Sequence, residues 1–280
     1  MKILIIGADG QLGTDLCKVI PKAEQIPLTI KDIDITNRQQ TLDAIKKYSP
    51  NVVINTAAYN QVDKAEEDSK LALAINRDGV KNVADACKAI DAAMVHISTD
   101  YVFDGKKNSP YVESDKPNPL SKYGKSKLAG EEVVRNSLDK YFIIRTTGLY
   151  GVAGCLEKGK TNFVDNIVKK ETATVVDDER ISPTYSYDLA RKIDQLARTN
   201  KYGLFHIVNN GDCSWYEFAR EIFKLLNRNP EKIVAGKIIT KAKRPKYSVL
   251  ANTKIKELGM DDLRPWQEAL QAYLKEKEYI

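Results

Sequence analysis

Residues 3–13 read Ile-Leu-Ile-Ile-Gly-Ala-Asp-Gly-Gln-Leu-Gly, an apolar run that leads directly into Gly7, Gly10 and Gly13. The apolar run predicts a buried strand, and the amphipathic stretch 12–20 behind it predicts a helix. Glycines at this spacing let the backbone turn tightly and approach a pyrophosphate, with the helix N-terminus facing the anion. Such turns also use glycine for structural reasons alone, but the flanking strand and helix favour a dinucleotide site with these three glycines as cofactor-binding residues.

The same alternation of short apolar runs and longer amphipathic segments continues through the first half of the chain. The runs are 3–6, 52–55, 94–98 and 141–145, and the segments between them include 12–20, 71–90 and 122–136. This order predicts an α/β protein with a Rossmann-type, doubly wound parallel sheet. Beyond residue 150 the pattern loosens. We therefore expect an NAD(P)-binding domain over 1–150, to which part of 180–200 returns, and a smaller C-terminal α/β domain over 151–280 that mainly binds substrate.

Composition excludes a membrane-spanning protein and argues against a protein held together by disulfides or a metal ion. The 280 residues carry 44 Lys plus Arg against 38 Asp plus Glu, and no window approaches the roughly 18 apolar residues of a membrane span. The four cysteines are far apart and only two histidines are present, so we expect neither disulfides nor a metal site. The cysteines are Cys17, Cys87, Cys155 and Cys213. A first strand that starts near residue 2 leaves no room for a signal peptide, so we expect a cytoplasmic protein without membrane or nucleic-acid partners.

The end of the second strand bears on the choice of cofactor. Dinucleotide sites that bind NAD often carry an acidic residue there, which would repel a 2′-phosphate. Here Thr29 stands at that place, and no carboxylate follows until Asp32. The sequence therefore favours NADPH, with NADH possible. Asp34 and the adjacent Ile35 are candidate cofactor contacts near the adenine, although Asp34 fits equally well as a cap of the following helix.

Tyr123-Gly-Lys-Ser-Lys127 is the clearest sign of chemistry in the chain. Residues i and i+4 share a helix face, so Lys127 should lie near the Tyr123 phenol and lower its pKa from about 10. A phenol tuned in this way can donate a proton to a carbonyl oxygen. The pattern alone is common in surface helices, but Thr99 at the end of the run 94–98 falls where α/β sheets bind ligands. Its hydroxyl could share the substrate oxygen with Tyr123.

Together these motifs resemble the extended short-chain dehydrogenases/reductases that act on nucleotide sugars and, within them, the dTDP-4-dehydrorhamnose reductase family. The resemblance covers essentially the whole chain. It is carried by NTAAYNQVDKAE at 55–66, STDYVFDG at 98–105, YGKSKLAGE at 123–131, SPT at 182–184, SWYEF at 214–218 and KRPKYS at 243–248.

The resemblance implies transfer of a hydride from NADPH to the C4 keto carbon of a dTDP-linked 6-deoxy-4-hexulose. The expected substrate is dTDP-4-dehydrorhamnose or a close relative, and a homodimer is possible. The resemblance implies that Tyr123 is the general acid, that Lys127 holds the nicotinamide ribose, that Thr99 binds the keto oxygen and that Asp100 contacts the sugar. The family's remaining cofactor positions correspond to Gln11, Leu12, Ala57, Ala58 and Tyr59.

Three departures from the family pattern cluster on the sugar side. Gly148 replaces a tryptophan that packs against the sugar, the loop 152–161 is longer than usual, and residues 179–181 read Glu-Arg-Ile where the family has Gln-x-Gly. These departures leave the exact hexulose open.

Two other functions of the same fold stay open as well. A 4,6-dehydratase or epimerase is disfavoured because a dehydratase needs a base at the position of Tyr101. A non-catalytic, NADP-binding regulatory subunit is disfavoured because it has no need of Thr99, Tyr123 and Lys127.

The positive charge of the chain is concentrated in one segment. Between Lys232 and Lys256 there are eight basic residues and no acidic one, so the rest of the chain is net negative. A nucleotide-sugar diphosphate needs such charge nearby. We therefore expect Arg244, with Lys246 as a second candidate, to contact the diphosphate of the substrate.

Overall fold

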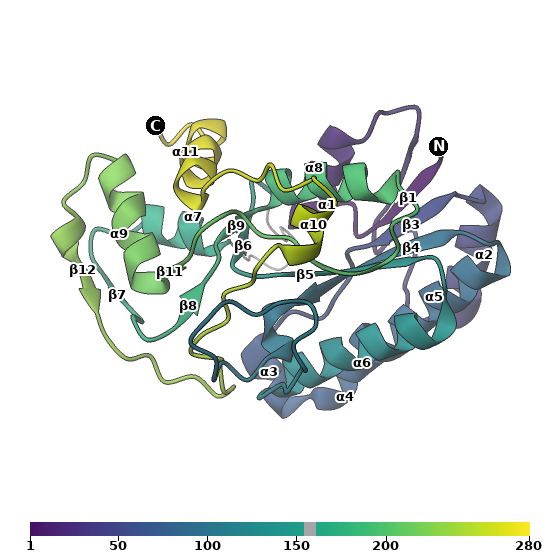
Figure 1. The fold of residues 1–280 in the computed structure, drawn as a ribbon, viewed down its shortest axis with the longest axis horizontal. Coiled ribbons are helices and arrows are strands. Elements are labelled where there is room, and N and C mark those ends of the chain that lie inside the picture. The colour runs from purple at the N-terminus through teal and green to yellow at the C-terminus, as the bar shows by residue number, and fades with distance from the viewer. Residues whose placement is uncertain (154–160) are drawn as a thin grey trace.

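Six parallel strands form the central sheet of the computed structural model, which describes residues 1–153 and 161–280. Their order is β2-β1-β3-β4-β5-β10 (Figure 1). The strands are β1 (Ile3–Ile6), β2 (Gln25–Leu28), β3 (Val52–Asn55), β4 (Ala93–Thr99), β5 (Tyr141–Thr146) and β10 (Gly203–His206). The strand order reverses at β1, so the ligand crevice of this type of sheet opens between the carboxyl ends of β1 and β3.

Helices cover both faces of this sheet. Helices α1 (Gln11–Val19) and α8 (Ser186–Ala197) pack on one face, where Ile3 and Ile5 point. Helices α2 (Arg38–Tyr48), α5 (Val80–Ala89) and α6 (Lys122–Ser137) pack on the other face, where Leu4 and Ile6 point. Strands buried on both faces explain why the runs are apolar throughout instead of alternating. The predicted fold class is confirmed.

The segment expected as one helix over 71–90 is built from several pieces. After α3 (Val62–Glu67) come α4 (Ser69–Leu73), a π-helix over Ala74–Gly79, and only then α5. A π-helical turn often marks a functional position, since it shifts the register of the side chains that follow. The turn here places Asn76 inward, with none of its surface exposed.

A second apolar core lies away from the sheet, toward the left of Figure 1. It joins Tyr150, Phe218, Trp266 and Tyr273 from distant parts of the chain. Its helices are α7 (Phe163–Val168), α9 (Trp215–Leu225) and α11 (Trp266–Glu276). Its two-stranded sheets pair β6 (Leu149–Tyr150) with β9 (Thr184–Tyr185), β7 (Ala173–Val175) with β12 (Ile233–Ala235), and β8 (Arg180–Ile181) with β11 (Cys213–Ser214).

The chain passes back and forth between the two cores. It returns to the sheet as α8, which packs on α1, and as β10, against which α10 (Thr253–Glu257) lies. The place of the domain boundary stays a prediction.

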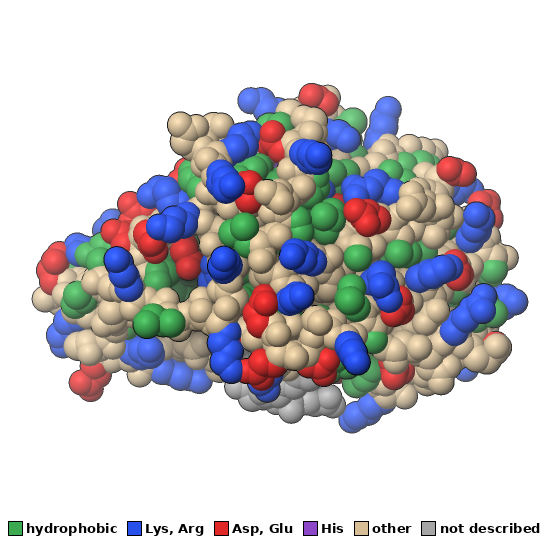
Figure 2. Space-filling model, turned by 90° about the horizontal axis from the view of Figure 1, so that it is seen from below, with side chains coloured by type: hydrophobic (Ala, Val, Ile, Leu, Met, Phe, Trp, Pro, Cys, Tyr) green, Lys and Arg blue, Asp and Glu red, His purple; other side chains and the backbone are tan. Residues whose placement is uncertain are grey.

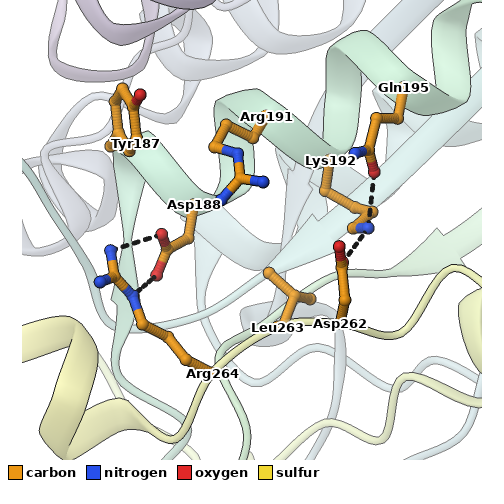
Figure 3. A pocket seen from close by; sticks show the side chains of 8 residues that line it. All are labelled: Tyr187, Asp188, Arg191, Lys192, Gln195, Asp262, Leu263 and Arg264. Atoms are coloured by element: carbon orange, nitrogen blue, oxygen red, sulfur yellow. Dashed lines mark hydrogen bonds and ion pairs between the residues drawn. The ribbon is translucent and has the colours of Figure 1, made fainter.

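A pocket of about 240 Å³ lies between α8 and residues 262–264 (Figure 3). The Arg264 guanidinium donates two hydrogen bonds of 2.8 and 2.7 Å to the buried Asp188, and Lys192 pairs with Asp262. The charges of these side chains are thus already matched across the pocket. We interpret it as a structural contact that holds the segment before α11 against α8, and not as a ligand site.

Three of the four cysteines lie in the described part and are free thiols, namely Cys17, Cys87 and Cys213. Cys155 and residues 154–160 of the predicted long loop lie outside the described residues. Within residues 1–153 and 161–280, no helix is long and apolar enough to cross a membrane.

Two isoleucines at opposite extremes of exposure test this account of the core. Ile54 in β3 is fully buried, whereas Ile239 is 100% exposed. Ile54→Ala should lower the free energy of unfolding by about 2–5 kcal/mol, because it removes packed methyl groups and leaves a cavity. Ile239→Ala should change it by less than about 0.5 kcal/mol. Urea unfolding followed by circular dichroism measures both, and equal effects would contradict the account.

Candidate active site

The glycine loop between β1 and α1 has a backbone that side chains would obstruct. Gly7 has a φ of +79°, and a Cβ there would lie 2.7 Å from Thr56 Oγ1. A Cβ on Gly13 would lie 2.1 Å from the Gly7 carbonyl oxygen. Gly10 precedes α1 without a side-chain cap, so the first N–H groups of the helix are open to a ligand. This loop fits the pyrophosphate of a dinucleotide.

The residues after this loop lie close to the second half of the chain. Gln11 is the first residue of α1, and its Cγ would lie 2.9 Å from a Cβ at Gly151. Leu12 is buried in the core beneath the loop. Gln11 therefore faces the region where β6 ends, whereas Leu12 supports the loop from below.

A carboxylate does lie at the end of β2, contrary to the expectation from sequence. The Thr29 N–H and Oγ1 both donate to Asp32 Oδ2, at 2.8 and 2.9 Å. These bonds lower the pKa of Asp32, and the bond from the Thr29 N–H has the larger effect. Asp32 is four residues past the last residue of β2, but the turn folds it back onto Thr29. The missing-carboxylate argument for NADPH is therefore weakened.

Asp34 and Ile35 have structural partners in this region. Asp34 Oδ1 accepts from the Thr36 N–H and hydroxyl at 2.9 and 2.8 Å, which makes a turn before α2. The N-cap of α2 is Asn37, so Asp34 caps the preceding turn instead of the helix itself. Ile35 is buried, and its Cγ1 would lie 2.8 Å from a Cβ at Gly79. Their contact with adenine stays a prediction.

Asn76, which the sequence gave no reason to single out, holds the segment after β3. Its Oδ1 accepts from the Tyr59 N–H at 2.9 Å, and its Nδ2 donates to the Tyr59 carbonyl and to Ser126 Oγ, both at 2.9 Å. One buried amide thus ties the predicted cofactor-lining stretch Ala57, Ala58 and Tyr59 to α6. In the sequence, Asn76 could have been noticed as a polar residue at a position where the helical pattern predicts a buried apolar side chain.

Tyr123 and Thr99 meet as predicted from their places in the fold. Ser121 caps α6 by accepting from the Gly124 N–H at 3.1 Å, which sets Tyr123 in the first turn. Burial raises the pKa of Tyr123 to about 12, although the Thr99 hydroxyl opposes the shift. The expected lowering by Lys127 is wrong: burial is the main influence on this pKa, and the Lys127 ammonium is bonded to the Ile97 carbonyl. At neutral pH Tyr123 is a protonated phenol, the form that a proton donor requires.

Lys127 lies against the inner strand β4, with only 3% of its surface exposed. Its Nζ donates to the Ile97 carbonyl at 2.6 Å. Burial lowers the pKa of Lys127 to about 8, while the Glu131 carboxylate opposes the shift. The i, i+4 spacing gives no information about this burial, and a role of Lys127 at the nicotinamide ribose stays a prediction.

Glu131 forms a buried junction behind the site. Arg145 at the end of β5 donates to both of its carboxylate oxygens, at 2.8 and 2.7 Å, and Ser98 Oγ donates to it at 2.6 Å. Glu131 and Arg145 are no more than 1% exposed. Ser98 precedes Thr99, so this junction connects α6 with the two strand ends that carry the site. Ser98 and Glu131 lie within the resemblance motifs and Arg145 ends a predicted strand, but the sequence gave none of the three a role.

Asp100 lies in the crevice next to Thr99 and is 3% exposed. The Thr99 hydroxyl donates to Asp100 Oδ1 at 3.0 Å. Burial raises the pKa of Asp100 to about 6, against the opposing effect of its hydrogen bonds. The hydroxyls of Ser248 and Thr147 also interact with this carboxylate. A buried carboxylate surrounded by hydroxyl groups suits a ligand that is itself rich in hydroxyl groups.

Gly148 and residues 179–181, two of the departures from the family pattern, meet in space. Gly148 has a φ of +55°, and a Cβ there would lie 2.7 Å from Ile181 Cδ1. The Ile181 side chain therefore fills the space that a side chain at 148 would enter. Two of the three departures thus compensate for each other in space, since the chain has a small residue at 148 where Ile181 of β8 approaches.

Arg244 and Lys246 have acidic partners from other parts of the chain. Arg244 Nη2 donates to Asp63 Oδ2 at 2.9 Å, and Lys246 pairs with Asp178 at 3.3 Å. Lys241 of the same basic segment pairs with Glu67. Figure 2 likewise shows Lys and Arg scattered among Asp and Glu over one face. The charge excess is therefore partly neutralised, and a diphosphate contact by Arg244 stays a prediction.

A dinucleotide-type glycine loop at β1 combined with a tyrosine and a buried lysine on α6 defines the extended short-chain dehydrogenase/reductase class of NAD(P)H-dependent oxidoreductases. The narrower assignment comes from comparison with known families. The model of a family described as the RmlD substrate binding domain matches residues 1–279. The chain belongs to this family.

Several proteins of this kind are similar to the chain over its whole length. The spore coat polysaccharide biosynthesis protein SpsK of Bacillus subtilis is 39% identical, covering 99% of this chain and 98% of SpsK. A solved dTDP-4-dehydrorhamnose reductase from Clostridium acetobutylicum has a TM-score of 0.93 and 42% identity, covering 99% of this chain and all of the other. A dTDP-4-dehydrorhamnose reductase from Bacillus anthracis, solved in complex with NADP, has a TM-score of 0.93 and 38% identity at the same coverage.

The buried Asp100 gives stability a specific dependence on pH. Its pKa of about 6 in the folded state lies above the ordinary value of 3.8, so the folded state binds the proton more tightly and loses stability as pH rises through this window. Asp100→Asn cannot ionise. Its free energy of unfolding relative to the parent should therefore improve by about 2 kcal/mol between pH 4.5 and 7.5. Urea unfolding at both pH values measures this, and a pH-independent difference would show that Asp100 is not desolvated.

Proposed function

We propose that the protein catalyses NADPH-dependent reduction of the C4 keto group of a dTDP-linked 6-deoxy-4-hexulose. The observation that carries the proposal is the protonated Tyr123 phenol beside Thr99 in the crevice, with Lys127 one helical turn behind. The similarity to dTDP-4-dehydrorhamnose reductases supports the choice of substrate.

NADPH is the proposed cofactor, and it supplies the hydride when bound. The NADP complex of the Bacillus anthracis relative supports this choice. Gly7, Gly10 and Gly13 would hold the pyrophosphate, because their backbone leaves room and donors for it. Lys127 would hold the nicotinamide ribose with its buried ammonium group. Asp32 lies next to Thr29, where a carboxylate would repel the 2′-phosphate of NADPH. The ratio of kcat/KM for NADPH and NADH therefore has to be measured directly.

Tyr123 would supply the proton. As the hydride reaches C4, charge develops on the keto oxygen, and the Tyr123 O–H donates its proton there, so that the ketone becomes a hydroxyl group. Thr99 would orient the keto oxygen by a hydrogen bond. The Lys127 charge would stabilise the phenolate that remains, even though burial keeps the phenol protonated beforehand.

Two features bear on the sugar and on the alternative functions. The wall formed by Ile181 over Gly148 and the buried Asp100 would determine which hexulose fits, with dTDP-4-dehydrorhamnose or a close relative as the proposed substrate. Burial raises the pKa of Tyr101 further still, so it stays a protonated phenol and cannot accept a proton, which speaks against a dehydratase. A non-catalytic regulatory subunit would have no use for the proton donor.

Tyr123→Phe tests the proposal. The substitution keeps the ring and its edge contact with Tyr101, whose centroid is 5.5 Å away, but removes the proton. We expect kcat to fall by about 10²–10⁴-fold with NADPH and dTDP-4-dehydrorhamnose, while the Kd of NADPH stays the same. NADH and other nucleotide-linked 4-keto sugars, assayed in parallel, define the cofactor and the hexulose. Near-normal turnover by the variant would rule out Tyr123 as the acid.

A further inference from the structure

We propose that Asp63 on α3 is a positioning residue that orients Arg244 toward the diphosphate of the sugar nucleotide. The inference rests on the proposed function, since it takes Arg244 as a ligand of that substrate. It adds a residue from the cofactor-binding half of the chain to the recognition of the sugar nucleotide.

Asp63 uses both carboxylate oxygens on one short segment. Oδ1 accepts from the Ala242 N–H at 3.0 Å, and Oδ2 accepts from Arg244 Nη2 at 2.9 Å. The first bond fixes the backbone two residues before Arg244, and the second fixes the guanidinium itself. A single side chain thus determines both where residues 242–244 lie and where the arginine points.

The orientation leaves one edge of Arg244 available. Its Nε is buried and has no partner among the described residues. A buried N–H group without a partner is costly, and a phosphate oxygen of the bound substrate would satisfy it. The same guanidinium acts electrostatically on Tyr101 and Glu179, and Tyr101 contacts the ring of Tyr123. Arg244 therefore lies on the side of the site that carries Tyr123.

Helix α3 also reaches the catalytic helix. Glu66 Oε1 accepts from the Lys122 N–H at 2.7 Å, at the first residue of α6. Asp63 and Glu66 thereby connect the segment that carries Arg244 with the turn that carries Tyr123. The distance between the two proposed substrate-binding groups is set through this short helix.

The ion pair between Arg244 and Asp63 is too exposed to serve mainly for stability. The side chains of Arg244 and Asp63 are 27% and 41% exposed, and ion pairs at such exposure contribute little to stability. The neighbouring pair of Lys241 with Glu67 joins the same two segments but is 67% and 56% exposed. It offers a matched control, because it has the same charges and the same connection but does not involve Arg244.

The test is steady-state kinetics of Asp63→Asn, which removes the charge but keeps an oxygen for the Ala242 N–H. We expect KM for the dTDP-4-keto sugar to rise about 5-fold, equivalent to about 1 kcal/mol, with kcat and the Kd of NADPH within about 2-fold of the parent. Glu67→Gln should leave all three unchanged. An unchanged KM in Asp63→Asn, or an equal rise in Glu67→Gln, would overturn the inference.

Arg244→Ala separates the inference from the function on which it rests. If Arg244 binds the diphosphate, this variant raises KM at least as much, and adding Asp63→Asn to it causes no further rise. If Arg244→Ala raises KM but Asp63→Asn does not, only the positioning role fails. If Arg244→Ala leaves KM unchanged while Tyr123→Phe abolishes turnover, the reductase function stands and the role of Arg244 fails, and that of Asp63 with it.

Discussion

The ion pair between Glu131 and Arg145 is the interaction on which the geometry of the site depends. It is buried from solvent, and Ser98 supplies a third hydrogen bond to the same carboxylate. Breaking a buried pair by removing one partner is costly, so α6 has little freedom to move away from the ends of β4 and β5. Tyr123 and Lys127 lie on that helix, and Thr99 lies on the strand beside it. Their relative positions are therefore fixed before any ligand arrives.

Two glycines on α6 make this close packing possible. A Cβ on Gly124 would lie 2.2 Å from the Tyr101 carbonyl oxygen, and one on Gly130 would lie 2.3 Å from the Asn76 carbonyl oxygen. The close approach removes water from Tyr123 and Lys127. Burial then raises the pKa of the phenol and lowers that of the ammonium. The chemistry proposed for the site thus follows from how tightly a helix packs on its neighbours.

Sequence reasoning succeeded where local pattern determines structure. The strand at 3–6, the glycine loop and the helix that carries Tyr123 were all predicted, because burial of strands and helix capping leave direct marks on sequence. It failed where the outcome depends on tertiary contact. Asp32 folds back onto Thr29 through a turn, and Asn76 points inward through a π-helical turn, neither of which periodicity reveals.

The direction of the Tyr123 pKa shift was also beyond the sequence. The i, i+4 spacing predicts proximity to Lys127 but not the desolvation that raises this pKa. In the same way, the sequence shows that Gly148 replaces a tryptophan, but not that Ile181 from another strand lies against this position.

The central claim is that this prearranged site delivers hydride and proton to one carbonyl group. The most direct measurement is a turnover with NADPH that carries deuterium at both hydrogen positions of nicotinamide C4, followed by NMR of the sugar product. The account predicts deuterium on C4 of the hexose and none elsewhere on the ring. Consumption of the substrate without deuterium at C4, or no turnover with any nucleotide-linked 4-keto sugar, would contradict it.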